Sequence, residues 1–342
     1  MATAPTQQPE RELATTVSSL GAETSNTVNL TAEGVKPVEL EVSLRSSAAI
    51  EARFIFTVAS NSSLKLSPAL ATESYTSEDS QLAFKLSFNA NGHHIIAMLA
   101  WHDLQMVSPK AYKVVEAILR NGDRTLQEAA TYPDDIRMKQ PATRPLHFID
   151  IPLQEGGPSE PELPAPPHVL SKIEEVTAAL KSGEGTDSDK VDALSWLIHL
   201  FGDLHQPLHC VDRFSDLHPA GDRGGNAFKL RGKAKNLHSL WDSSVNIMTP
   251  SRDEELIVTD IMTAYPRSSE SISADLESPD PSTWARASFT LAKVHAYGEL
   301  VEDPTNPPTP SSDYLVNTEK IGQRQAALAG YRLSDRLKDI FG

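Results

Sequence analysis

Residues 199–210 read HLFGDLHQPLHC, and this short stretch carries three histidines and one aspartate. It closes a segment with apolar residues at helical spacing, so the sequence predicts a helix over about residues 188–205, ended by Pro207. The apolar stripe consists of Val191, Leu194, Leu197, Ile198, Phe201 and Leu204. His199 and Asp203 are four residues apart, so they project from one face of this helix, beside the stripe. A carboxylate buried there without a cation would be costly, which favours a bound metal ion.

The remainder of the chain from about residue 92 also has helical patterning. Ser108 and Pro109 begin one predicted helix and Gly122 ends it, and further helices are predicted over 169–181, 283–302 and 318–341. Residues 155–168 form a loop rich in proline and glycine. The chain has no internal repeat and no strong sheet signal, so the sequence predicts an all-α body.

The N-terminal part differs from this body. Residues 1–87 are rich in Ser, Thr, Ala and Glu, and only the run VELEV at 38–42 alternates as a strand would. We therefore expect residues 1–87 to be a disordered or minor extension and residues 88–342 to form one helical domain. No signal peptide is visible at residue 1, because MATAPTQQPERELATT lacks an apolar core.

Composition limits the possible functions. The net charge of −15 disfavours unspecific binding to nucleic acids or anionic membranes, so a nucleic-acid substrate would need a local positive centre. No apolar run is long enough to predict a membrane span. The single cysteine, Cys210, excludes an intrachain disulfide and cysteine-rich zinc sites, and we expect it to be a small buried residue. A metal site must therefore use histidines, carboxylates or backbone groups.

A second pair of residues repeats the spacing of the first. His238 and Asp242, in NLHSLWD, are also four residues apart, and Asp134, His147 and His209 supply further donors. A lone His-x-x-x-Asp pair is more often a solvent-exposed helical pair than a metal site. Two such pairs in one chain favour the metal, and the donors exceed the capacity of one tetrahedral zinc. The sequence therefore predicts a multinuclear site.

Two other motifs allow more than one interpretation. Gly224-Gly225-Asn226 by itself indicates only a turn. The stretch KLRGKAK at 229–235 carries four basic residues just before His238. It is either a solvated loop or a rim that attracts phosphate in an otherwise acidic protein.

In this order, LHFID, HLFGDLHQPLH, GGN and NLHSLWD resemble the zinc-dependent single-strand nuclease and 3′-nucleotidase family, from about residue 88 to the C-terminus. The resemblance implies an all-helical domain with three zinc ions in a cleft. It implies a first zinc on Asp134, His147, His199 and Asp203, and a second on His209, His238 and Asp242. It implies a third on His93, the bridging Asp203, and the backbone amine and carbonyl of Phe88. The histidines at 94, 102, 168, 205, 218 and 295 are expected to lie outside the site.

The same resemblance implies hydrolysis of single-stranded DNA or RNA and of 3′-nucleotides by a zinc-bridging hydroxide. Arg137 would bind the phosphate, Asp150 would orient the water or contact the base, and Asn226 would hold the substrate. Phe148 either stacks on a nucleobase or packs in the core. Family members are usually secreted or periplasmic, and we expect the same here. No feature of the sequence indicates a protein partner.

The chain departs from the family pattern at one ligand and in its cysteines. The family's mature chain begins with a tryptophan where this chain has Phe88, whose nitrogen is an amide while residues 1–87 remain attached. Eukaryotic secreted members usually carry disulfides. Two alternatives stay open: a zinc phospholipase C on the same helical scaffold, and a non-enzymatic metal-binding helical protein with an incomplete third zinc site.

Overall fold

The computed structural model describes the backbone of residues 38–45, 51–58 and 77–342, and the side chains from residue 90 onward. The chain divides into two compact units, Met1–Asp79 and Ser80–Gly342. In the first unit, β1 (Val38–Arg45) and β2 (Glu51–Val58) pair antiparallel, with Val38 opposite Val58. The strand predicted at 38–42 is therefore confirmed as part of β1.

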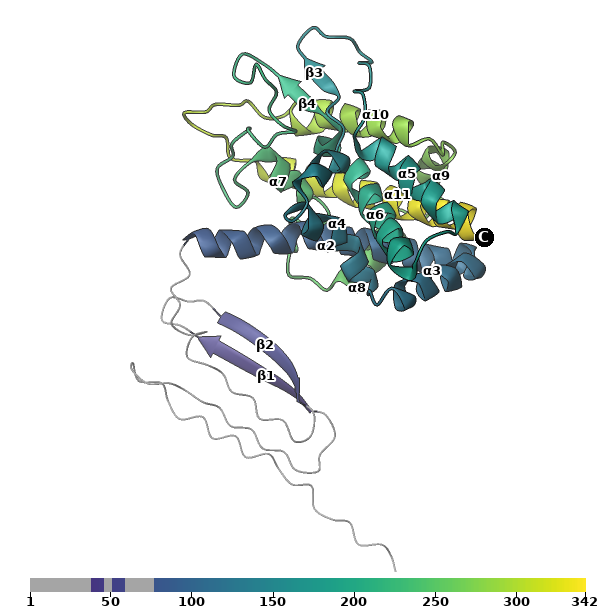
Figure 1. Cartoon of the computed structure of the whole chain (residues 1–342). Coiled ribbons are helices and arrows are strands. Elements are labelled where there is room, and N and C mark those ends of the chain that lie inside the picture. The colour runs from purple at the N-terminus through teal and green to yellow at the C-terminus, as the bar shows by residue number, and fades with distance from the viewer. Residues whose placement is uncertain (1–37, 46–50, 59–76) are drawn as a thin grey trace, which may run out of the picture. The chain divides into compact units, whose positions relative to one another are not determined.

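The second unit is helical, and the predicted all-α body is confirmed (Figure 1). Its α-helices are α2 (Ser77–Val107, which begins in the first unit), α3 (Pro109–Asn121), α4 (Leu126–Arg137), α5 (Val169–Ser182), α6 (Asp187–His205), α7 (Leu237–Asp242), α8 (Glu254–Ala264), α9 (Glu270–Leu276), α10 (Pro281–Leu291) and α11 (Ser312–Phe341). Short helical turns add η1 (Pro141–His147), η2 (Pro207–Cys210) and η3 (Ala292–Ala296). The described helices include none that is both long and apolar enough to cross a membrane.

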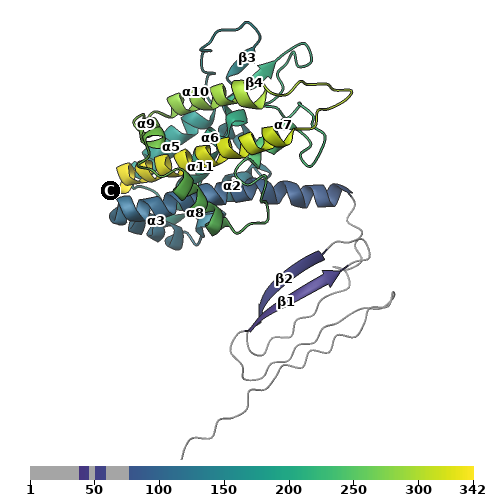
Figure 2. The same ribbon diagram turned by 180° about the vertical axis from the view of Figure 1, so that it is seen from behind.

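Helix α6 lies among the other helices of this unit. Figure 2 shows it from behind, packed with α5, α10 and α11, and it also contacts α3 and α4. Thr186 caps its start, where the Thr186 hydroxyl accepts the backbone N–H of Asp189 and the Asp189 carboxylate accepts that of Thr186. Every residue from Leu194 to His205 is buried. The predicted apolar stripe is thus part of a helix enclosed on all sides, so its polar side chains must find their partners inside the protein.

Three helix boundaries differ from prediction. The predicted 283–302 helix is α10 followed by the wider turn η3, and helical structure ends at Ala296. Gly298 has poor helix propensity, and prolines follow at 304, 307, 308 and 310. The C-terminal helix begins at Ser312, earlier than predicted, because the Ser311 hydroxyl caps it by accepting the N–H of Tyr314. Helix α2 also begins well before residue 92.

A small parallel sheet fixes two segments of the site beside each other. β3 (Pro152–Gln154) pairs with β4 (Asp212–Phe214), with Pro152 opposite Asp212, near α10 in both views (Figures 1 and 2). Just before these strands, Ile149 donates its backbone N–H to the carbonyl of His209 at 2.8 Å. The segments that follow η1 and η2 are therefore held in register at the point where each brings in a histidine.

Candidate metal centre

Three groups of histidines and aspartates converge in the helical unit, and within each group the candidate ligand atoms lie within 4.8 Å of one another. The first group is Asp134 from α4, His147 from η1 and His199 from α6. The second group is His209 from η2 with His238 and Asp242 from α7. The third group is His93 from α2 with His199 and Asp203 from α6. Every side chain that the resemblance places on a zinc ion belongs to one of these groups.

Three of the histidine rings are oriented in the same way, each by a hydrogen bond from Nδ1 to a backbone carbonyl. The Nδ1 atoms of His199, His209 and His238 lie 2.7, 2.9 and 2.8 Å from the backbone carbonyls of Ala130, His147 and Gly224. A carbonyl only accepts, so each Nδ1 carries the proton and donates it. Each ring therefore directs Nε2 toward its group, and the deprotonated Nε2 is the form of imidazole that binds a metal. Burial by itself would lower the pKa of His209, but Asp203 and Asp242 raise it to about 9, so metal binding there displaces a proton.

The tightest convergence lies around Asp203, which is buried. Its Oδ2 atom, His199 Nε2 and His147 Nδ1 form a triangle with sides of 3.0 to 3.1 Å. His199 Nε2 and the carboxylate oxygen are both acceptors, so they repel each other unless a cation or proton lies near both. Tetrahedral ligands of a zinc ion at about 2.0–2.1 Å would lie roughly 3.3 Å apart. The donor types and their spacing therefore fit a zinc ion. A second observation concerns the other nitrogen of His147: its Nε2 is buried and has no hydrogen-bond partner among the described residues.

The charge on Asp203 follows from its neighbours. Burial by itself would raise the pKa of this carboxyl, but His199 and His209 hold the pKa well below its usual range. The pKa of Asp242 is lowered to about 2, since His238 and His209 outweigh the effect of burial there as well. Both carboxylates are therefore ionised at neutral pH and can bind a cation without first losing a proton.

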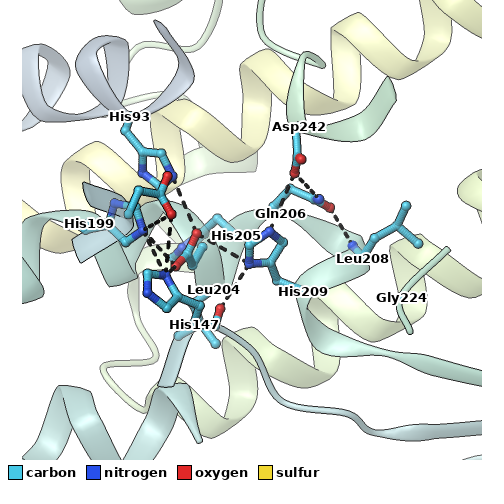
Figure 3. A network of polar contacts seen from close by, with 12 residues as sticks. His93, His147, His199, Leu204, His205, Gln206, Leu208, His209, Gly224 and Asp242 are labelled. Atoms are coloured by element: carbon cyan, nitrogen blue, oxygen red, sulfur yellow. Dashed lines mark hydrogen bonds and ion pairs between the residues drawn. The ribbon is translucent and has the colours of Figure 1, made fainter. Parts of the chain in front are cut away.

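The rings of the first and third groups lie together on one side of the centre. Figure 3 shows His93, His147 and His199 there, with His209, Gln206 and Asp242 on the other side. Gln206 donates from Nε2 to the Asp242 carboxylate at 2.8 Å and accepts the Leu208 N–H through its other amide atom at 2.5 Å. Gln206 therefore orients a candidate ligand on α7 from the turn that ends α6.

His238 depends on a glycine loop for its orientation. The carbonyl that it contacts belongs to Gly224, which has a φ of +59° and where a Cβ would lie 2.3 Å from the Leu208 carbonyl oxygen. The carboxylate of Asp222 holds this loop, because its Oδ1 accepts the N–H of Gly225 at 3.0 Å and the hydroxyl of Tyr297 at 3.1 Å. Asp222 itself has no exposed surface. The GGN motif is therefore more than a turn, since it carries the acceptor for a candidate ligand.

Gly202 makes room for His93. The His93 ring stacks on the His199 ring with centroids 3.9 Å apart, and His93 Nε2 lies 3.4 Å from Asp203 Oδ1. A Cβ at position 202 would lie only 2.7 Å from His93 Nδ1. A glycine inside a helix costs about 1 kcal/mol relative to alanine. Here it lets α2 bring a ring against the face of α6.

The other predicted site residues lie around these groups. Arg137 pairs with Asp134 at 3.0 Å, so the candidate phosphate-binding cation contacts a first-group carboxylate. Asp150 has an exposed side chain, yet desolvation by surrounding protein and the nearby Asp212 raise its pKa to about 6.

Phe148 is half-buried and, among the described residues, is not one of the apolar side chains packed against the two cores. Asn226 donates its side-chain amide to the carbonyl of Arg223 at 2.9 Å. Phe88 lies within α2, in the part whose side chains fall outside the described residues.

The histidines predicted to lie outside the site have other partners. His205 Nε2 accepts from Arg332 at 2.8 Å, His94 contacts Glu254 and His102 contacts Glu255. His168 caps α5, His218 contacts Glu302, and His295 lies 3.6 Å from Glu299. Cys210 is buried with its Sγ 3.4 Å from the carbonyl of Leu204, which confirms the prediction for that residue.

Sequence patterns did not identify three residues that shape the centre: Gln206, Asp222 and Gly202. Gln206 and Gly202 stand inside the opening stretch between candidate ligands, and Asp222 lies two positions before the GGN motif. Proximity to the motifs was a usable signal for all three. Their partners lie in other segments, so neither their contacts nor their roles could be read from spacing.

Comparison with known proteins agrees with this geometry. A family model described as S1/P1 Nuclease matches residues 88–342. The chain belongs to the S1/P1 nuclease family. Endonuclease 4 of Arabidopsis thaliana is 25% identical over 291 residues, which are 75% of this chain and 90% of the relative. Nuclease S1 of Aspergillus oryzae (strain ATCC 42149 / RIB 40) is 23% identical over 265 residues, or 71% and 88% of the two chains. Nuclease P1 of Penicillium citrinum is 28% identical over 167 residues, or 46% and 57%.

Family membership fixes the class of reaction. The chain is a nuclease, a hydrolase that acts on phosphodiester bonds, and its substrate is nucleic acid. The candidate metal-binding groups lie within the matched region.

Proposed function

We propose that this S1/P1 nuclease is a zinc-dependent enzyme that cleaves single-stranded DNA and RNA and releases phosphate from 3′-nucleotides. One observation supports the metal above all. Three histidines donate the Nδ1 proton to backbone carbonyls and direct Nε2 toward the ionised carboxylates of Asp203 and Asp242. Nitrogen and carboxylate donors in closed groups of this kind suit zinc, whereas calcium and magnesium favour oxygen ligands.

The first zinc would be held by Asp134, His147, His199 and Asp203, and the second by His209, His238 and Asp242. The first assignment has direct geometric support, since Asp134 Oδ1 lies 3.9 Å from His147 Nδ1 and 3.8 Å from His199 Nε2. The second has similar support, since Asp242 Oδ1 lies 3.5 and 3.6 Å from the Nε2 atoms of His209 and His238. The third zinc would use His93, Asp203 and the backbone of Phe88.

Bound zinc supplies a nucleophile at neutral pH by lowering the pKa of water, and it neutralises charge on the phosphate oxygens. The protein residues around it orient the substrate. Arg137, on the last turn of α4, pairs with Asp134 of the first group and would hold a phosphate oxygen there. Asp150 is exposed at the segment that joins η1 to β3, and its carboxylate can accept a proton or a hydrogen bond from the substrate or attacking water. Asn226 presents an amide from the loop that anchors His238.

A preference for single strands would come from Phe148. This ring lies next in sequence to His147 and is partly exposed, so it can stack on a base. Stacking on an aromatic ring tolerates every base, but the base must leave its partner strand. A duplex would have to open before it met both the ring and the metal centre.

The family assignment favours this proposal over the two alternatives from the sequence. A phospholipase C would use similar metal chemistry on lipid headgroups, and a non-enzymatic protein would bind metal without turnover. Both are tested together with the nuclease when hydrolysis of single-stranded DNA, 3′-AMP and phosphatidylcholine is compared on one zinc-loaded preparation.

The decisive experiment pairs metal analysis with turnover. His238→Ala should lower the zinc content and abolish cleavage of single-stranded DNA, because the second group loses one of two imidazoles. His102→Ala is the matched control, since that half-buried histidine contacts Glu255, belongs to none of the three groups, and should be dispensable for zinc and activity. Full activity and normal zinc in His238→Ala would refute the assignment. Equal rates on duplex and single-stranded DNA would refute the strand preference.

The third zinc has a separate test. Protein processed to begin at Phe88 offers a free amine, whereas the intact chain offers a peptide nitrogen at that position. We expect the processed form to bind one more zinc per chain and to turn over faster on 3′-AMP. Identical zinc content in the two forms would remove Phe88 from the ligand set. A secreted or periplasmic location rests on the resemblance alone, and cell fractionation would test it.

A further inference from the structure

The basic loop before α7 is a well-braced element. In the segment Phe228–Leu237, the Leu237 N–H bonds the Phe228 carbonyl at 3.0 Å, and the Leu230 N–H bonds that of Lys235 at 3.1 Å. Lys229 and Asn236 form an antiparallel bridge between these bonds. Phe228 and Leu237 are fully buried at its base. The segment is therefore a short hairpin-like loop with a fixed base, and Gly232, with a φ of +127°, makes its turn.

Its four cations all reach solvent. The side chains of Lys229, Arg231, Lys233 and Lys235 are exposed. Arg231 bonds the side chain of Asn306, and its backbone N–H donates to the carbonyl of Pro308 at 2.9 Å, so a neighbouring segment braces the loop with neutral groups. Within the part of the chain that the structure describes, no acidic side chain forms an ion pair with any of the four. Their charge is available to a partner.

The loop leads directly into the candidate metal centre. Asn236 caps α7 by accepting the N–H of Ser239 at 2.8 Å, and His238 of the second group is two residues further along. The loop extends at most about four residues from its base, or roughly 13 Å at the usual rise of an extended strand. Its cations therefore lie within that distance, plus the length of a side chain, of the base that leads into α7, and phosphates that neighbour the one being cleaved would be within their reach.

The net charge of the molecule explains why a basic loop would matter for binding nucleic acid. A net charge of −15 opposes the approach of a polyanion. A mononucleotide brings one phosphate, which the metal centre itself can hold. A strand brings further phosphates that need cations outside that centre, and lysines supply such contacts without regard to sequence.

We propose that the Phe228–Leu237 loop is a binding site for the sugar-phosphate backbone of single-stranded nucleic acid beyond the cleaved bond. The proposal rests on the proposed function, whose metal centre it extends, and it explains how one enzyme could bind strands more tightly than nucleotides. The loop contributes to affinity and to salt dependence and takes no part in the chemistry at phosphorus.

The test compares two triple variants with equal charge change. One is Lys229→Gln, Lys233→Gln and Lys235→Gln; the other is Lys113→Gln, Lys293→Gln and Lys338→Gln, at exposed positions on α3, η3 and α11. Binding of a fluorescein-labelled phosphorothioate 15-mer is measured by anisotropy over a range of salt concentrations. In parallel, kcat/KM is measured for 3′-AMP, and thermal melting checks that both variants fold.

We expect the loop variant to bind the oligomer about tenfold more weakly at low salt than the control variant. Its plot of log affinity against log salt should be shallower by about 2, because each phosphate that a lysine no longer neutralises lowers the slope by roughly 0.7. Its kcat/KM for 3′-AMP should match that of the control. Equal oligomer binding by the two variants would overturn the proposal, and an equal loss on 3′-AMP would do so by showing that the loop shapes the metal centre instead. Failure of the proposed function is distinct, since the wild type would then hydrolyse neither nucleotides nor strands whatever the binding result.

Discussion

His205 offers a sharp test of which histidines in the opening stretch are structural. It lies on α6 between candidate ligands and is 2% exposed. Its Nδ1 donates to the Phe201 carbonyl at 2.7 Å, and its Nε2 accepts from Arg332 of α11 at 2.8 Å. Burial and the neighbouring guanidinium lower its pKa to about 3. Both nitrogens are occupied, so His205→Gln should leave zinc content and nuclease activity intact while it changes how stability depends on pH.

The magnitude follows from proton linkage. In the unfolded chain a histidine has a pKa of about 6.5, so below that pH it binds a proton that the folded protein accepts only near pH 3. The unfolded state therefore binds more protons, and the stability of the wild type falls as the pH falls from about 6.5 toward 3. At pH 5 this single histidine lowers the free energy of unfolding by roughly 2 kcal/mol relative to pH 8, because pH 5 lies about 1.5 units below the unfolded pKa and each unit is worth about 1.4 kcal/mol.

In His205→Gln the titrating group is gone, but a side-chain oxygen remains to accept from Arg332. At pH 8 the variant should be less stable than the wild type by about 1 kcal/mol, for imperfect hydrogen bonds. At pH 5 the order should reverse, and the two stability curves should cross near pH ~6. For a domain of this size, 1 kcal/mol corresponds to about 2–4 °C in Tm.

Thermal melting of both proteins from pH 5 to pH 8, with zinc present, measures the crossing. The ligand histidines titrate in both proteins, so the difference between the two curves isolates His205. Parallel curves would refute the buried neutral histidine. A loss of zinc in His205→Gln would show that His205 is a metal ligand and not a structural partner of Arg332.

Three further substitutions separate the ligands from the residues that place them. Gly202→Ala should lower the zinc content by up to one ion and slow turnover, because its methyl group displaces His93. Tm should fall as well, since overpacking and the lost ion outweigh the gain of about 1 kcal/mol in helix propensity. Asp222→Asn should weaken zinc binding about 10–100-fold in competition with a chelator, because the loop that orients His238 loses its charged anchor. Asp150→Asn should lower kcat about 100-fold with unchanged zinc content by metal analysis, as expected for a group that acts on substrate and not on metal.

The local elements of the fold were accessible from the sequence. Helix α6 follows from an apolar stripe with Pro207 after it, and α3 follows from Ser108, Pro109 and Gly122. These signals lie within a few residues of the boundaries that they set. The end of α10 was missed because the wider turn η3 follows it, which places the Tyr297 hydroxyl on Asp222. That contact joins residues 75 positions apart, and helical periodicity carries no information about it.

The candidate ligands could also be predicted from the sequence, because residues at i and i+4 lie on the same face of a helix. Their grouping was harder to predict. His199 lies near atoms of both the first and the third group, and Asp203 approaches His93, His147 and His209 at 3.0 to 3.4 Å. Spacing assigns a side chain to a face, but it does not say how many metal positions that face can serve. That number depends on where α2, α4 and η1 place their donors around α6.

The contrast between His205 and its neighbours shows where sequence reasoning reaches its limit. His199, His205 and His209 lie in one stretch, and each donates Nδ1 to a backbone carbonyl. What differs is the partner offered to Nε2. For His199 the partner is the Asp203 carboxylate, and a cation between the two groups relieves the repulsion of their lone pairs. For His205 the partner is the Arg332 guanidinium, which donates an N–H hydrogen bond. Arg332 lies 127 residues away on α11, so no pattern within the stretch could separate a ligand from a structural histidine. The packing of α11 against α6 therefore decides which of these histidines is left available to bind metal.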